Sequence, residues 1–162
     1  MVGLAAIACG AAAPAGESRH AQATNSGADR IAGASAKPGR IYVTVNDLRN
    51  ARGVVRACMT GNAQAFPKCG DAAGARSTVV NARTGTVTLM FDNVPPGRYA
   101  IALLHDENGN NKADRAMGMM PKEGFGFSRD AKVRMGPPRF DDAVFEVDQG
   151  DRRLAIHMRY MF

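Results

Sequence analysis

The 162-residue chain contains no tryptophan, and aromatic residues make up only 6% of it. With three histidines and three cysteines, it has little material for catalytic or metal sites that need clusters of these residues. No apolar run approaches the roughly 20 residues of a transmembrane helix. Acidic residues are outnumbered by basic ones, 15 against 21, but the basic residues are scattered and lack interleaved aromatics, so nucleic-acid binding is not expected.

The first 23 residues have the composition of a signal peptide. They are apolar and alanine-rich, and Ala21 and Ala23 satisfy the small-x-small rule of cleavage sites, although no Lys or Arg precedes Arg19. We therefore expect a signal peptide over residues 1–23 and a periplasmic or secreted protein; the competing interpretation is an alanine-rich tail. Lipid attachment at Cys9 is less favoured, because the third position before this cysteine is not leucine and only eight residues precede it.

Residues 24–39 are small and polar and predict a flexible linker, so we place the single folded domain at 40–162. Apolar and polar residues alternate there in seven segments, and no helical stripe is present. This pattern predicts an all-β fold, an antiparallel sandwich of the immunoglobulin-like or prealbumin-like kind with one long glycine-rich loop. The turn RNARG predicts a hairpin between the first two segments. The segments are 40–48, 53–60, 76–82, 85–91, 98–105, 143–148 and 152–161.

Cys58 and Cys69 remain once the leader is removed, with ten residues between them. In an oxidising compartment this spacing favours a disulfide, worth roughly 2 to 3 kcal/mol in the entropic account of loop closure. A metal pair would need a CxxC or a nearby histidine, and a catalytic thiol would need a base. Neither is visible.

The segment HDENGNNKAD, residues 105–114, raises the question of a cation-binding loop. Oxygen-bearing side chains recur at alternate positions, as in calcium loops of the Asp-x-Asn-x-Asn type. The sixth position is Asn111, which tolerates a left-handed backbone, but the twelfth is Met117 in place of a bidentate glutamate. The predicted ligands are Asp106, Asn108, Asn110, the carbonyl of Lys112, and Asp114.

With only two carboxylates in register, this loop predicts weak Ca²⁺ binding unless Glu107 or Glu123 adds a third. The alternative is that Asn-Gly-Asn-Asn is simply favourable turn chemistry.

The segment 117–138 is long for a connection between strands. Phe125 and Phe127 alternate with glycines, so their rings can share one side of an extended chain. With Arg129 and Arg134 they form a candidate site for a small ligand or a glycan. The alternative, which we favour, is that the rings close one end of the sandwich and the arginines are solvated.

A hydrolase using His105 with Asp106 or Asp114 is the least favoured interpretation. Neighbours on a strand point to opposite faces, so His105 and Asp106 do not by themselves form a dyad. We expect a non-catalytic binding or structural domain of the cell envelope, whose partner is an envelope component or a small ligand. Its oligomeric state is not indicated.

The segment DNVPPGRYAIALLHDENGN contains a Pro-Pro-Gly turn followed by a strand that begins near Tyr99. Together with LRNARGVVRACMT, FPKC, MGMMPKEGFGFSRDA and MGPPRFDDAVFEV, in this order, it resembles the bacterial family catalogued as domain of unknown function 2141. The resemblance covers about residues 40–162. It implies an exported β-sandwich of unknown activity, without catalytic residues to carry over.

Overall fold

The computed structural model describes residues 37–116 and 120–161. The predicted signal peptide, Cys9, most of the predicted linker and Met117 lie outside these residues. No described helix has the length and apolar character needed to cross a membrane. The elements are β1 (Gly39–Leu48), β2 (Val54–Thr60), β3 (Arg76–Asn81), β4 (Gly85–Val94), β5 (Gly97–Asp106), β6 (Arg115–Ala116), β7 (Met120–Pro121), β8 (Gly124–Phe127), η1 (Ser128–Asp130), α1 (Phe140–Ala143), β9 (Phe145–Val147) and β10 (Arg152–His157).

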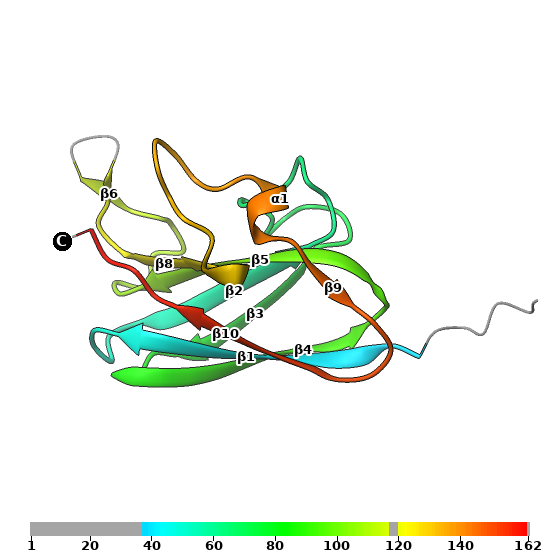
Figure 1. Ribbon diagram of the computed structural model, residues 1–162. Helices are drawn as coiled ribbons and strands as arrows, with labels where there is room; N and C mark the ends of the chain where they lie inside the picture. The colour runs from blue at the N-terminus through cyan, green and yellow to red at the C-terminus, as the bar shows by residue number, and fades with distance from the viewer. Residues whose placement is uncertain (1–36, 117–119, 162) are drawn as a thin grey trace, which may run out of the picture. The chain divides into compact units, whose positions relative to one another are not determined.

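Two sheets pack face to face (Figure 1). One has three strands in the order β10-β1-β4. The other has the order β3-β2-β5-β8, with β9 also paired to β5, while β6 and β7 form a separate hairpin. All pairs are antiparallel except β1 with β10. The predicted β-sandwich is confirmed, and the seven predicted strands correspond to β1 to β5, β9 and β10.

The main core lies between the two sheets and follows from the alternation in the sequence. On β1, Ile41, Val43 and Val45 are fully buried, whereas Tyr42 and Thr44 point to the other face and are half-buried. Strands of the facing sheet contribute Val55, Met59, Ile101 and Leu103 among others. Burying about ten such aliphatic side chains, each worth roughly 1.5 to 3 kcal/mol, is the main favourable term that holds the sheets together.

A second, smaller core covers the outer face of the five-stranded sheet. Four phenylalanines form most of it. The ring of Phe66 packs edge-to-face against Phe127 and Phe140, with ring centroids 5.8 and 6.2 Å apart. Phe66 lies in the connection closed by the disulfide between Cys58 and Cys69, whose Cα atoms are 5.8 Å apart. The predicted disulfide is thus confirmed, and it holds a covering loop against the sheet.

The predicted hairpin between β1 and β2 is wrong. β1 pairs with β4 and β10, and β2 pairs with β3 and β5, so the two strands lie in different sheets. Asp47 has a left-handed backbone with φ 62°, and the register with β4 shifts between Val45 and Leu48. This irregularity bends the chain out of one sheet, and the RNARG turn carries it into the other.

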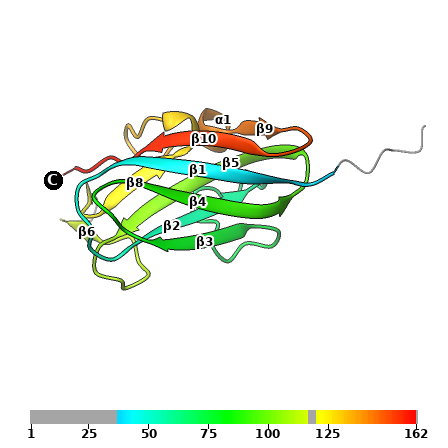
Figure 2. The same ribbon diagram turned by 90° about the horizontal axis from the view of Figure 1, so that it is seen from below.

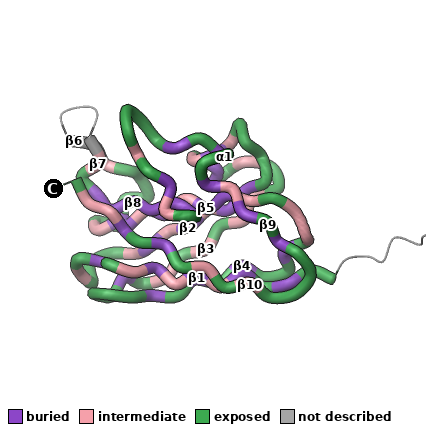
Figure 3. The backbone as a smooth tube through the Cα atoms, in the orientation of Figure 1, coloured by how far each residue is buried: buried purple, intermediate pink, exposed green. Residues whose placement is uncertain are grey.

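The predicted long loop contains a strand that the sequence did not indicate. β8 pairs with β5, and all four of its residues are buried (Figure 3). Its phenylalanines face the second core, and its glycines face the opposite side. A Cβ at Gly124 would overlap the ring of Tyr160, and one at Gly126 would lie 3.1 Å from Ile156 Cγ2. The glycines therefore let the C-terminal segment approach β8.

Candidate functional site

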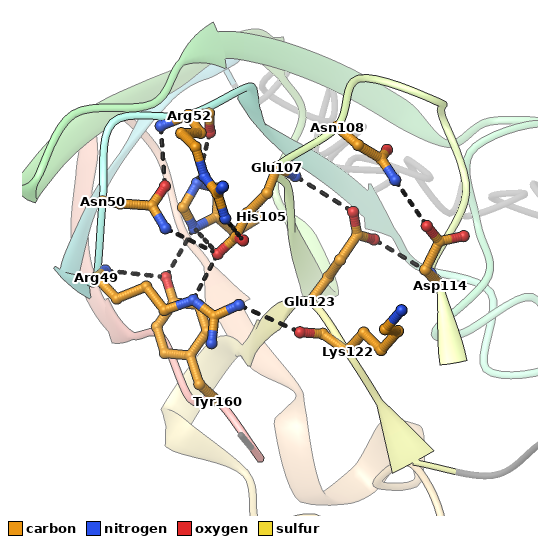
Figure 4. Close-up of polar contacts among 10 residues, drawn as sticks. All are labelled: Arg49, Asn50, Arg52, His105, Glu107, Asn108, Asp114, Lys122, Glu123 and Tyr160. Carbon is orange, nitrogen blue, oxygen red and sulfur yellow. Dashed lines mark hydrogen bonds and ion pairs between the residues drawn. The ribbon is translucent and has the colours of Figure 1, made fainter. Parts of the chain in front are cut away.

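Polar side chains gather at one end of the sandwich, where the β1–β2 turn, the exit of β5, the residue before β8 and the C-terminal segment meet (Figure 4). We call this group the polar end cluster. Its members are Arg49, Asn50, Arg52, His105, Glu107, Glu123 and Tyr160.

His105 lies at the centre of the polar end cluster and has no solvent exposure. Its Nε2 is 2.9 Å from the carbonyl oxygen of Arg52, and its Nδ1 is 2.8 Å from the hydroxyl of Tyr160. Because a carbonyl can only accept, Nε2 donates to the carbonyl of Arg52, and Nδ1 shares a hydrogen bond with the tyrosine hydroxyl. The Tyr160 oxygen in turn accepts from the amide of Arg49 at 3.2 Å. Both ring nitrogens are therefore engaged within the fold.

Glu107 fixes the β1–β2 turn to the end of β5. Its carboxylate accepts hydrogen bonds from Arg49 at 2.6 Å, Arg52 at 3.0 Å and Asn50 at 3.2 Å. The bond from Arg49, helped by those from Arg52 and Asn50, lowers the pKa of Glu107 to about 2 in spite of burial. The nearest oxygen is 3.8 Å from His105 Nδ1, which is too long for a hydrogen bond, so the two residues do not form a dyad.

Glu123 is a buried carboxylate that bridges two backbone segments. It accepts from the amide of Glu107 at 3.2 Å and from the amide of Asp114 at 3.1 Å. Burial raises its pKa, and the charges of Asp106 and Asp114 raise it further. Glu123 thus reaches the predicted cation loop, but with both oxygens already engaged.

Asp106 is completely buried on the face of β5 opposite His105. Its oxygens accept from Arg56 Nε at 2.9 Å and from the amides of Asn110 at 3.1 Å and Asn111 at 2.9 Å. Burial alone would raise its pKa, but the hydrogen bonds from Arg56 and the two amides outweigh burial, and the pKa lies below its ordinary value. Asp106 is a structural anion that organises the loop after β5.

The remaining loop side chains also bond within the loop. Asn108 and Asn110 accept through their oxygens from the amides of Asn110 and Lys112, at 3.0 and 2.8 Å. Their side-chain nitrogens donate to Asp114 at 2.7 and 3.0 Å. Asn111, at the predicted glycine position, has φ 64°. The predicted ligands are therefore neighbours on one curled loop, where the oxygens of Asp106, Asn108 and Asn110 accept from backbone amides and Asp114 accepts from side-chain amides.

Over the described ranges, no three or more His, Cys, Asp or Glu residues are grouped so that they could hold a metal ion. Arg56 also places a guanidinium against Asp106, where a cation would have to bind.

The predicted ligand-binding residues do not form a single site. Phe125 and Phe127 are 9% and 8% exposed and pack in the second core, over the outer face of the sheet. Arg129 and Arg134 instead line a separate surface groove of about 560 Å³ formed by the segment 129–142.

The second described histidine, His157, lies at the surface. Its Nδ1 is 2.8 Å from Asp130, whose other oxygen accepts from the His157 amide, and this contact raises the pKa of His157. The pair caps the end of β10.

Sequence reasoning missed most of the polar end cluster. Arg49, Asn50 and Arg52 were visible only as a polar turn, and Tyr160 as one more residue of a terminal strand. One signal could have pointed to these residues. Glu107 and Glu123 flank the end of a buried strand, and buried carboxylates need hydrogen-bond donors nearby.

The model of a family described as uncharacterised proteins conserved in bacteria, DUF2141, matches residues 43–155. Neither the curated proteins nor the solved structures contain a match.

Proposed function

The chain belongs to the DUF2141 family of uncharacterised bacterial proteins, and from this premise we propose that it is a non-catalytic β-sandwich domain of the cell envelope with a binding or structural role. The resemblance stated from the sequence is thereby confirmed at the level of the family.

The buried state of His105 carries the proposal. A general base must present a free nitrogen within hydrogen-bond reach of a substrate. In His105 both nitrogens serve the fold, one on the carbonyl of Arg52 and one on Tyr160. The contact holds the C-terminal segment against the β1–β2 turn, which is a structural task.

Two further observations support an envelope location. The disulfide between Cys58 and Cys69 is the kind of bond that persists in oxidising compartments. A basic chain with a formal charge of +6 is suited to the anionic surfaces found there.

Weak calcium binding by the loop from Asp106 to Asp114 is a finer part of the proposal. Carboxylate and amide oxygens are suitable calcium ligands, and the left-handed Asn111 supports the required curl. Binding would have to turn the Asn108 and Asn110 oxygens away from backbone amides and compete with Arg56 for Asp106. This competition supports a calcium affinity in the millimolar range.

The non-catalytic role is tested with Tyr160→Phe and His105→Gln in the full chain. Removing the tyrosine hydroxyl leaves Nδ1 of His105 buried without its hydrogen-bond partner, which costs about 1 to 3 kcal/mol. We expect a lower melting temperature for both variants. We also expect no turnover above buffer by wild type or variants on nitrophenyl esters, phosphates and glycosides.

Turnover by the wild type that disappears in folded Tyr160→Phe or His105→Gln protein would instead make the polar end cluster an active site. Unchanged melting temperatures in both variants would remove the structural role.

A further inference from the structure

One border of the sandwich presents two uncovered strand edges. β3 is the outer strand of the five-stranded sheet and β4 that of the three-stranded sheet, and both lie at the same border (Figure 2). The opposite border is covered, because β8 and β9 pair with β5 and Phe125 exchanges hydrogen bonds of 3.0 and 2.8 Å with Arg159. Within residues 37–116 and 120–161, no segment pairs with the outer edge of β3.

Beyond Arg76 at its first residue, the β3 edge lacks the features by which proteins usually block such edges. Its sequence, RSTVVN, has no proline and no lysine, and its six pairs with β2 run without a register shift. Val79, in its middle, is 48% exposed. By contrast, the ladder of β4 with β1 is irregular near both ends. β3 is therefore the regular edge on which another strand can pair.

A groove of about 640 Å³ runs beside this edge. Val80 and Val87 give it a partly apolar floor, and Arg83 stands exposed at one end without a partner among the described residues. The lining residues are Val79, Val80, Asn81, Arg83, Thr86, Val87 and Thr88. The groove thus offers apolar contacts, hydroxyl and amide groups, and one free guanidinium.

We propose that the β3 edge binds an extended segment of an acidic partner polypeptide, which adds to the five-stranded sheet as a further strand. Main-chain hydrogen bonds to β3 supply the affinity, and side chains on alternate positions supply the specificity. β-branched residues of the segment face Val80 and Val87, and a carboxylate pairs with Arg83. The six residues of β3 span about 20 Å, enough for a segment of five or six residues.

The positive charge of the chain favours an acidic partner over a second copy of this chain. Arg76 and Arg83 flank the exposed part of β3, and the whole chain carries a formal charge of +6. A two-fold pairing of β3 with its copy would bring four arginines into one interface, and like charges in such a contact are destabilising. An acidic partner turns the same charges into attraction.

This inference rests on the proposed binding role, but its experiment does not use the polar end cluster, so the two fail separately. The probe is a fluorescently labelled ten-residue peptide in which valine and threonine alternate and two positions are glutamate. Binding to the full chain is followed by fluorescence anisotropy at several salt concentrations. We expect saturable binding that weakens with salt, and at least tenfold weaker binding by Arg83→Glu. The control Lys132→Glu changes the net charge equally in the separate groove of the segment 129–142, and should alter affinity less than twofold.

A proline variant separates edge pairing from simple charge attraction. In an antiparallel ladder, amides of successive residues point alternately toward the neighbouring strand and away from it. Of Thr78→Pro and Val79→Pro, one therefore removes a bond to β2 and the other only an outward donor, and hydrogen exchange of the free protein identifies which. The outward variant should keep its circular dichroism spectrum and lose peptide binding.

Four results would overturn the proposal. They are absence of binding at millimolar peptide, equal binding by Arg83→Glu, unchanged binding by the folded proline variant, and protection of every β3 amide in the free protein, which would mean that the edge is already occupied. A dimer that the same proline variant dissociates, seen by light scattering, would assign the edge to a second copy instead.

Discussion

Glu107 is a carboxylate that accepts hydrogen bonds from three side chains, those of Arg49, Asn50 and Arg52. Its pKa of about 2 lies below the ordinary value of 4.5 because Arg49, Arg52 and Asn50 bind the ionised form. A carboxyl group with a depressed pKa contributes stability that is fully present above its unfolded pKa and is lost as pH falls toward the folded value. The shift corresponds to a contribution on the order of 3 kcal/mol at neutral pH.

We therefore expect Glu107→Gln to lower the free energy of unfolding at pH 7 and to have a smaller effect at pH 3. Urea titrations at both values measure the difference. The raised pKa of Glu123 gives the opposite dependence of stability on pH, because it favours the protonated form. The contribution of Glu107 is therefore isolated only by comparing the variant with wild type at each pH. The exposed Glu146→Gln serves as control, and an equal loss at both pH values would contradict the assignment.

His105 and Asp106 show how far single residues could be predicted. Alternation along a strand placed them on opposite faces, and the structure confirms it, with His105 toward Tyr160 and Asp106 toward Arg56. The partners themselves lie 55 and 50 positions away in sequence. No local sequence pattern identifies partners so far away in the chain. The opposite orientation of His105 and Asp106 could therefore be predicted, but their contacts with Tyr160 and Arg56 could not.

At the scale of elements, the alternation of apolar and polar residues predicted most strands, but it did not predict how the strands are connected. The RNARG turn has ordinary hairpin chemistry, yet β1 and β2 lie in different sheets, and Arg49 and Arg52 of this turn bind Glu107, the residue after β5. β8 was hidden because glycine alternating with phenylalanine is also typical of loops. Its strand conformation depends on pairing with β5 and on room for Tyr160.

The loop from Asp106 to Asp114 gives a prediction at this scale. Ligand binding to the native state raises stability by mass action. With a dissociation constant of about 1 mM, about 10 mM Ca²⁺ should add roughly 1.4 kcal/mol and raise the melting temperature by about 5 °C relative to EDTA. Differential scanning fluorimetry of the full chain measures this shift.

Asp114→Asn should abolish the calcium response, because it removes one of only two carboxylates in register. The matched control Asp141→Asn, on the exposed first turn of α1, should keep it. A wild-type melting temperature that is equal in EDTA and in calcium would leave the loop as a turn organised by Asp106.

For the molecule as a whole, the sandwich was predictable because seven alternating segments can bury their apolar faces only against each other. The second core was less visible. Phe66 lies in the connection between β2 and β3, whereas Phe127 ends β8 and Phe140 begins α1, and only the folded sheet brings them together.

The disulfide links this second core to the rest of the domain. Reduction should free the connection that carries Phe66 and destabilise the protein by about 2 to 3 kcal/mol. Thermal unfolding with and without a phosphine reductant measures the loss, and mass spectrometry after thiol alkylation reports the bond. The double variant Cys58→Ser/Cys69→Ser should resemble reduced wild type and be insensitive to the reductant. A reductant effect of equal size in that variant would show that the disulfide is not its cause.

The parallel pairing of β1 with β10 bears on when the domain can fold. The first strand stays without one of its two neighbours until residues 152–157 have been made, and His105 lacks its hydroxyl partner until Tyr160 follows. Contacts between such distant parts of a chain form late and slowly. A nascent chain therefore cannot complete this sandwich before its C-terminal segment has left the ribosome.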